Sequence, residues 1–281
     1  MAKVKNFKTI FPAVSVPLND DFSINEAEFR TYLRWIKSFY GKGIEGLVCN
    51  GHTGEITGLS RAERKRVVEI CSEECGDCMT IISGINCENT TESIEMAAEA
   101  KAAGADGILL MPPHMWLRFG MNPDAPFQYV KDGTRVTSIY EHDVRLLRQE
   151  CPDISLITCH DETLCVSWFP GMDGALIGFA GCVPELICPA REVFANPDKH
   201  TLKEAQDWSD RIYHISQAIY GGGQPSGEAH ARLKEALYQR GIFSNALMRK
   251  PVLPLNQEEK DWVALGLERS RLPKVDMEQY K

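Results

Sequence analysis

The stretch Gly46-Leu47-Val48-Cys49-Asn50-Gly51-His52-Thr53-Gly54-Glu55 decides how this chain folds. An apolar run that ends in glycines and polar side chains is typical of a buried strand followed by a tight turn. Ser60 and Glu63 then make the pattern Ser-x-x-Glu, which predicts a capping box at the start of a helix. The stretch therefore predicts a strand, a turn that displays a hydroxyl, a carboxylate and an imidazole, and a helix. The same pattern also fits a glycine-rich turn that binds no ligand.

Outward from this stretch, strands and helices alternate along the chain. Apolar runs typical of strands begin near residues 9, 44, 79, 107, 154 and 173. Between the first four of these runs, apolar residues recur with the spacing of a helix. This alternation indicates βαβ units and a parallel sheet. From residue 184 onwards the pattern predicts helices alone, over 184–194, 201–220, 228–240 and from 258. We expect a strand–helix region over 1–183 and a helical region over 184–281 that completes and extends it.

The overall composition excludes several classes of protein. The chain has 281 residues, 43% of them hydrophobic and 25% charged, which is typical of a globular protein. A net charge of −8 argues against a surface for nucleic acid or an anionic membrane. The segment Met1–Asn6 lacks the apolar core of a signal peptide, and no apolar run is long enough to cross a bilayer. We therefore expect a cytoplasmic protein without a nucleic-acid or membrane partner.

Ten cysteines need an explanation. Most stand singly in apolar runs, where a reduced thiol packs as a small apolar side chain. Cys71, Cys75 and Cys78 have the spacing with which radical-SAM enzymes hold an iron–sulfur cluster. They follow a helix and precede a strand, which in a βα barrel is the face opposite the chemistry. We therefore predict no metal cluster at these cysteines.

Gly51-x-Thr53-Gly54-Glu55, with Leu59-Ser60-x-x-Glu63 after it, resembles a motif of the dihydrodipicolinate synthase / N-acetylneuraminate lyase family. The resemblance continues through five further stretches: Ser83-Gly84-Ile85, Asn89-Thr90-Thr91-Glu92-Ser93, Ala103–Pro113, Gly174–Gly178 and Pro251–Leu255. Members of that family are pyruvate-handling aldolases and dehydratases with a (β/α)8 barrel. The resemblance therefore implies a TIM barrel and a homo-oligomeric lyase that uses neither a metal nor an organic cofactor.

The strand count falls short of that barrel. A closed barrel of this type has eight strands, whereas the sequence offers six, or seven with Phe127–Val130. The interval between the strands near 107 and 154 has no room for two complete βα units of about 30 residues each. We therefore predict an α/β fold of the (β/α)8 TIM-barrel family that is incomplete, with C-terminal helices. Because missing strands leave open sheet edges, we expect a distorted barrel or an oligomer.

The resemblance also assigns roles to residues of the turn. In the family, the Gly-x-Thr-Gly-Glu turn holds the carboxylate of pyruvate, which implies this role for Thr53 and for the backbone of Gly51 and Gly54. His52 stands where many members have a second hydroxyl. Its imidazole either replaces that hydroxyl in proton transfer or only fixes the turn. We expect Glu55 to brace the turn rather than to act as a general base.

Family members form a Schiff base on a strand-six lysine and move protons through a strand-five tyrosine. No segment like Tyr-Asn-x-Pro follows residue 110, and the nearest lysine is Lys131. In one alignment, Phe127–Asp132 ends the fourth helix and both family residues are deleted. In the other, Phe127–Val130 is strand six and Lys131 forms the Schiff base. We favour the first, because Asp-Ala-Pro before an aromatic residue suits a helix start.

Two functions of different classes follow from these patterns. In the first, the chain is a lyase that acts on pyruvate or another small 2-keto acid through a lysine Schiff base. Lys131 and His52 are then catalytic, and Arg135 and Gly178 line the distal part of the pocket. In the second, the chain is a non-catalytic deletion variant that keeps at most carboxylate binding. The motifs favour the lyase, and the strand count favours the variant.

Overall fold

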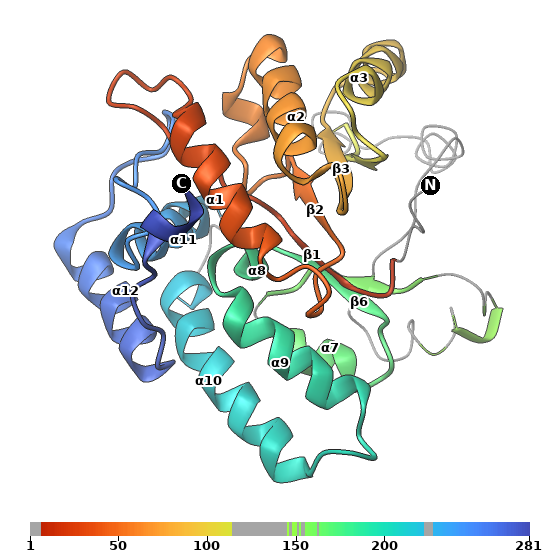
Figure 1. Ribbon diagram of the computed structural model, residues 1–281, viewed down its shortest axis with the longest axis vertical. Helices are drawn as coiled ribbons and strands as arrows, with labels where there is room; N and C mark the ends of the chain where they lie inside the picture. Colours follow the sequence, from red (N-terminus) through yellow and green to blue (C-terminus); the bar gives the residue numbers. More distant parts are fainter. Residues whose placement is uncertain are drawn as a thin grey trace.

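The structure is a computed structural model that describes residues 7–113, 145, 148–150, 152, 155–161, 163–221 and 227–281 (Figure 1). The predicted strand Phe127–Val130 lies outside these residues, as do Lys131 and Arg135. The alternative alignments of that segment therefore stay predictions.

Six strands, all parallel to their partners, form the centre of the described fold. They are β1 (Ile10–Pro12), β2 (Gly46–Cys49), β3 (Thr80–Ile85), β4 (Gly107–Leu110), β5 (Ile157–Thr158) and β6 (Gly174–Ile177). One sheet has the order β2-β3-β4 and the other the order β1-β6-β5. Bridges from Ile10 to Ile44 and from Ala13 to Val48 join β1 to the β2 side. The described strands therefore lie in the order β5-β6-β1-β2-β3-β4.

This order brings the last described strand beside the first, as in a barrel that closes on itself. Leu176 of β6 pairs with Phe11 of β1, and the Ala13 amide donates to the Ile177 carbonyl at 3.0 Å. Among the described residues, β4 and β5 each have a strand partner on one side only. The parallel α/β architecture is confirmed, and six described strands are consistent with an incomplete barrel.

Helices follow most of the strands and continue alone to the C-terminus. They are α1 (Glu26–Lys37), α2 (Arg61–Cys75), α3 (Thr90–Ala102), α7 (Leu164–Trp168), α8 (Phe179–Cys182), α9 (Pro184–Ala195), α10 (Leu202–Tyr220), α11 (Gly227–Gln239) and α12 (Gln257–Arg269), with short 3-10 turns at Ile56–Gly58 and Met277–Tyr280. Figure 1 shows α9 and α10 side by side, with α12 against α10. None of the helices in the described ranges is long and apolar enough to cross a membrane.

Local sequence signals explain where α2 begins. The Ser60 side chain accepts a hydrogen bond from the Glu63 amide at 3.3 Å, and Glu63 Oε2 accepts from the Ser60 amide at 2.8 Å. This is the predicted capping box, and it is confirmed. It sets the residue at which α2 begins, and the turn at residues 50–59 therefore ends at Ser60.

One large hydrophobic core extends from the strands into the C-terminal helices. It contains side chains of β1, β2, α1 and α2 together with side chains of α9, α10, α11 and α12, from Ile10 to Leu267. The regions 1–183 and 184–281 therefore share a core. Side chains of α10 and α11 thus pack in the same core as side chains of β2 and β6.

Cys71 and Cys75, whose spacing with Cys78 matches that of an iron–sulfur site, are packed as apolar side chains. Cys71 and Cys75 are buried on α2, and burial raises the pKa of Cys75 to about 12. The Cys75 thiol donates to the Leu33 carbonyl of α1. Within the described ranges, no three His, Cys, Asp or Glu side chains are placed to share a metal ion.

Candidate active site at the carboxyl ends of the strands

The turn after β2 is compact and tightly fixed. Asn50 and Glu55 both adopt left-handed backbone conformations, with φ of 53° and 55°. The Glu55 amide donates to the His52 carbonyl at 2.9 Å, and the Ile56 amide donates to the Gly51 carbonyl at 3.2 Å. Between them, Thr53 is buried, whereas His52 is exposed. The turn thus presents its imidazole to solvent and its hydroxyl to the interior.

The neighbouring strand β3 holds this turn in place from one side. Asn50 donates from Nδ2 to the Arg64 carbonyl at 2.9 Å and to Ser83 Oγ at 3.1 Å. A Cβ atom on Gly84 would lie 1.8 Å from the Asn50 carbonyl oxygen, so only glycine permits this approach. Ser83 and Gly84 of the sequence motif therefore support the turn, Ser83 by a hydrogen bond and Gly84 by allowing close backbone approach.

The C-terminal region braces the turn from the other side through Glu55. Glu55 Oε1 accepts a hydrogen bond from Lys234 Nζ, and Oε2 accepts from the Arg249 amide at 2.8 Å. Lys234 also donates to the Leu247 carbonyl at 2.8 Å and is only 1% exposed. Burial lowers the pKa of Lys234, while the Glu55 carboxylate opposes that change. Glu55 thus has the bracing role expected of it.

Arg249 adds a second tie between the C-terminal segment and the turn. Its guanidinium pairs with Glu63 of the capping box and donates to the Gly58 carbonyl at 2.7 Å. This hydrogen bond to Arg249 lowers the pKa of Glu63 to about 2. One carboxylate therefore caps α2 and anchors the C-terminal segment at the same time.

Thr53 and Gly178, both predicted site residues, meet at the ends of β2 and β6. A Cβ atom on Gly178 would lie 3.1 Å from Thr53 Oγ1, 3.4 Å from Tyr220 Oη and 3.1 Å from Leu233 Cδ1. Two hydroxyls and one methyl group therefore converge on the position directly over Gly178. Tyr220 ends α10 and Leu233 lies on α11, and neither residue was predicted as part of the site.

His52 has a second imidazole beside it that the sequence did not indicate. The ring centroids of His52 and His230 are 6.0 Å apart, with the ring planes tilted by 60°. Burial, together with the smaller effect of the nearby His52, lowers the pKa of His230 to about 4. At neutral pH, His230 is therefore an uncharged imidazole that can donate or accept a proton.

Asp161 and Phe179 connect β5 and β6 to the site. The buried Asp161 carboxylate accepts a hydrogen bond from the Phe179 amide at 2.6 Å. The Phe179 ring then packs edge-to-face against Tyr220, with the ring centroids 5.3 Å apart. This contact positions the phenol of Tyr220 relative to the end of β6.

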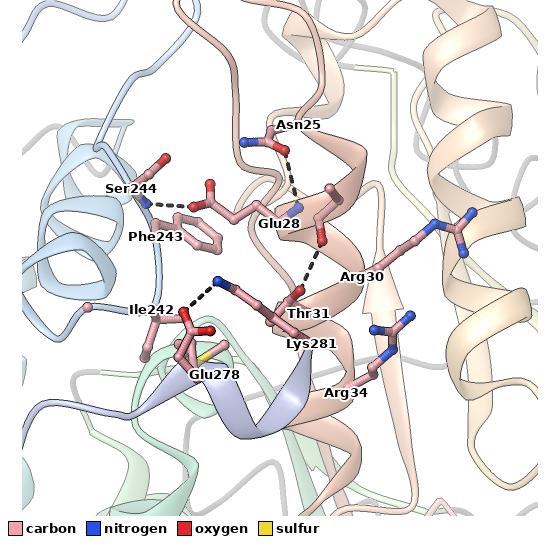
Figure 2. Close-up of a pocket in the computed structure, with 13 residues that line it drawn as sticks. Asn25, Glu28, Arg30, Thr31, Arg34, Ile242, Phe243, Ser244, Glu278 and Lys281 are labelled. Carbon is pink, nitrogen blue, oxygen red and sulfur yellow. Dashed lines mark hydrogen bonds and ion pairs between the residues drawn. The ribbon is translucent and has the colours of Figure 1, made fainter.

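A separate cavity of about 650 Å³ lies between α1 and the C-terminal segment (Figure 2). Several of its polar groups have partners: Glu28 Oε1 accepts from the Ser244 amide at 2.7 Å, and Arg30 and Arg34 bind Glu74 on α2. Among the described residues, the buried Glu28 Oε2 has no hydrogen-bond partner. Figure 2 shows the two arginines directed away from Glu28. No residue of the turn after β2 lines this cavity, so we place the candidate site at the strand ends instead.

Comparison with known proteins identifies the lineage of this arrangement. The sequence profile of the Dihydrodipicolinate synthetase family matches residues 6–122. A 4-hydroxy-tetrahydrodipicolinate synthase of Brucella abortus is 34% identical over 279 residues, covering 86% of this chain and 91% of that protein. The enzyme of the same name from Agrobacterium fabrum is 40% identical over 108 residues, or 38% of this chain and 36% of that protein.

Solved structures share the fold. Dihydrodipicolinate synthase from Oceanobacillus iheyensis superposes with a TM-score of 0.80 at 19% identity, covering 93% of this chain and 96% of that one. N-acetylneuraminate lyase from Fusobacterium nucleatum superposes with a TM-score of 0.76 at 20% identity, covering 94% and 99%. The Brucella relative is 34% identical over most of both chains, and the solved structures share the fold. Together with the motif in the turn after β2, this shows that the chain belongs to the dihydrodipicolinate synthetase family.

Proposed function

We propose that this chain is a lyase, an aldolase or dehydratase, that acts on pyruvate or another small 2-keto acid. The observation that carries the proposal is the Thr53 hydroxyl, which is buried at the carboxyl end of β2 and directed at Gly178. A carboxylate is bound well by fixed donors in a site with little water. The turn that holds Thr53 is fixed by Gly84 and Glu55, so its donors need little reorganisation.

In this proposal, the amine of Lys131 attacks the keto carbon of the substrate. The nitrogen–carbon bond forms, and the former keto oxygen leaves as water after it has been protonated. The amine must be uncharged to react. His52, at the exposed edge of the turn, supplies and removes the protons, and Arg135 binds the distal part of the substrate.

Lys234 is a poor candidate for this nucleophile, although it is a buried amine near the turn. Its Nζ donates to the Glu55 carboxylate and to the Leu247 carbonyl, and its side chain is 1% exposed. Burial lowers the pKa of Lys234, but both hydrogen bonds hold its Nζ against fixed acceptors and leave it no access to a carbonyl carbon. Its position supports a brace rather than a reactive amine.

A second candidate function is a non-catalytic member of the family that keeps at most carboxylate binding. Because β6 pairs with β1, β6 and β5 occupy the places of the last two strands of a barrel. The strands that carry the tyrosine and the lysine in the family would lie between β4 and β5, and they are not among the six described strands. Without the tyrosine and the lysine, the chain would bind a 2-keto acid but could not form a Schiff base with it.

Borohydride trapping separates the two functions. The protein is incubated with pyruvate and sodium borohydride, and the modified lysine is located by intact-mass and peptide mass spectrometry. The lyase function predicts an adduct on Lys131 that is absent without pyruvate, absent in Lys131→Arg and reduced in Thr53→Val. An adduct on another lysine would reassign the nucleophile. A folded protein without any adduct would support the non-catalytic function.

A further inference from the structure

A cavity of about 350 Å³ lies between α11, the first turn of α12 and the segment 244–255. Phe22, in the loop before α1, also lines it, whereas the predicted site residues His52, Thr53 and Gly178 do not. A hollow of this size, walled mainly by apolar side chains with a few polar groups, is typical of a small-ligand site. The described chain therefore has a second place for a ligand, apart from the strand ends.

Three large apolar side chains from distant segments meet at this cavity although all three are exposed. They are Phe22, Tyr238 on α11 and Leu253 in the segment 244–255, and Leu253 is 80% exposed. Single exposed apolar side chains are common on protein surfaces, but a group of them around one hollow marks a surface that binds something. An apolar ligand in the cavity would shield part of this group from water.

The backbone at Phe22 has an unfavourable conformation at the edge of the cavity. Its φ of 64° lies in the left-handed region, which is costly for a bulky side chain. The Phe22 amide donates to the Asn19 carbonyl at 2.9 Å, and the Phe22 carbonyl accepts from Arg249 Nη2 at 2.8 Å. These hydrogen bonds hold the residue beside the cavity despite the cost.

The segment 244–255, which forms one wall, is itself tied to the rest of the fold. Asn245 donates from Nδ2 to the Leu18 carbonyl at 2.9 Å. The Arg249 amide donates to Glu55 at 2.8 Å, and the Arg249 guanidinium pairs with Glu63. A wall that is fixed before the ligand arrives has little freedom left to lose on binding.

Positive charge prevails along the cavity, although the whole chain has a net charge of −8. Lys250 and Lys260 line it, and neither ammonium forms an ion pair with a carboxylate of the described residues. Glu235 is the single carboxylate among the described lining residues. It is buried and accepts a hydrogen bond from Gln239 Nε2 at 2.9 Å. The lining thus combines an apolar surface with two unpaired ammonium groups, which favour an anion.

We propose that this cavity binds a small apolar carboxylic acid, with an aryl or a branched alkyl body. Its carboxylate pairs with Lys250 and Lys260. Its apolar body packs against Phe22, Tyr238 and Leu253. The site is separate from the strand ends, so the inference does not depend on the proposed lyase activity.

Calorimetric titration with phenylacetate, without pyruvate, tests the ligand class. Acetate has the same charge without the ring, and 2-phenylethylamine has the same ring with the opposite charge. We expect phenylacetate to bind at least about tenfold more tightly than either of them. Slower hydrogen exchange within residues 244–255 on addition of phenylacetate would locate the binding at this cavity.

Two sets of variants separate the lysines from the apolar group. We expect the double variant Lys250→Met and Lys260→Met to weaken phenylacetate binding about tenfold. The control with equal loss of charge combines Lys199→Met and Lys274→Met, which are exposed and line none of the described cavities, and should bind like the wild-type protein.

Leu253→Ser should weaken phenylacetate binding about threefold because it removes part of the apolar surface. Leu202→Ser, at an exposed position of α10, is its control and should leave the affinity unchanged. Both leucines are exposed, so neither substitution should disturb folding, and circular dichroism checks this for every variant.

The results can overturn the inference in several ways. Equal phenylacetate affinity in the wild-type protein and in the double lysine variant would do so, as would equal binding of 2-phenylethylamine. A wild-type protein that does not bind phenylacetate would also contradict it. If light scattering then showed that Leu253→Ser breaks up an assembly, the exposed apolar group would be an interface between copies of the chain instead.

Discussion

At the scale of single residues, His230 shows how the fold sets the charge of the site. The imidazole is largely enclosed by α11 and the turn after β2, so the protonated form loses its hydration and the pKa falls to about 4. His230 is therefore uncharged at neutral pH where its ring lies 6.0 Å from that of His52.

This lowered pKa predicts how stability depends on pH. The unfolded chain binds a proton at His230 near pH 6.5, whereas the folded chain does so only near pH 4. The free energy of unfolding should therefore fall as the pH falls from about 6.5 to 4, by up to about 1.4 kcal/mol per pH unit from this residue. Above pH 6.5 the residue should contribute no pH dependence.

Urea unfolding at pH 7 and pH 5 measures this effect. We expect His230→Gln to lose less stability between the two values than the wild-type protein does. His200→Gln, at the start of α10, is the control and should retain the wild-type pH dependence. If the free energy of unfolding depends on pH equally in the wild-type protein and in His230→Gln, His230 does not have a lowered pKa in the folded chain.

The sequence could predict those residues of the candidate site that lie in short motifs, but not those whose role depends on packing between distant segments. Thr53, Gly178 and Glu55 lie in short motifs whose spacing carries chemical meaning. Tyr220 and His230 lie at or near helix ends of ordinary composition, more than 160 residues from Thr53. Their contribution depends on the packing of α10 and α11 against the strand ends, and no local pattern in one sequence encodes that packing.

At the scale of elements, the brace between α11 and the turn after β2 is an ion pair with almost no solvent. Lys234 and Glu55 are both buried, and each has a further backbone partner. Removal of one member would leave an uncompensated charge, which typically costs about 3–5 kcal/mol. Removal of both charges would cost much less.

The prediction is tested with Lys234→Met, Glu55→Gln and their combination. We expect Lys234→Met alone to lower the free energy of unfolding by about 3–5 kcal/mol, and the double variant to recover much of that loss. Lys203→Met breaks the exposed pair with Asp207 on α10 and should cost about 1 kcal/mol or less. Guanidinium unfolding curves give the change in the free energy of unfolding for the two single variants, the double variant and the control. If the effects of Lys234→Met and Glu55→Gln simply add in the double variant, the two side chains do not form the proposed brace.

Element boundaries were predictable where side chains cap the backbone locally. The Ser60–Glu63 box fixed the start of α2, and the proline at the start of α9 (Pro184–Ala195) marked that helix. The short helix α8 was not predicted, because Phe179–Cys182 is an apolar stretch that follows β6 without a cap. Its conformation depends on Asp161 and on burial between other elements, which are tertiary effects.

At the scale of the whole molecule, the row of described strands ends at β4 and β5. Ile108 of β4 is 36% exposed, although it lies on a parallel strand of an α/β fold, where such residues are normally covered. An exposed apolar residue on an edge strand favours pairing with another chain. We therefore predict that the protein associates with copies of itself.

Light scattering after size-exclusion chromatography, over a range of concentrations, tests this prediction. We expect a dimer or a larger assembly, and we expect Ile108→Lys to weaken it. Ile94→Lys, at an exposed position on α3, serves as the control with an equal change of charge. A protein that stays monomeric at all concentrations and melts sharply would contradict the prediction.

The ion pair between Glu55 and Lys234 spans 179 residues of the chain, which has a consequence for biosynthesis. A ribosome makes the turn after β2 long before it makes α11. Until then, the Glu55 carboxylate has neither the Lys234 ammonium nor the Arg249 amide that bind it in the folded protein. The motif that marks the family is thus translated early, yet its turn acquires its native support only when the last fifth of the polypeptide has emerged.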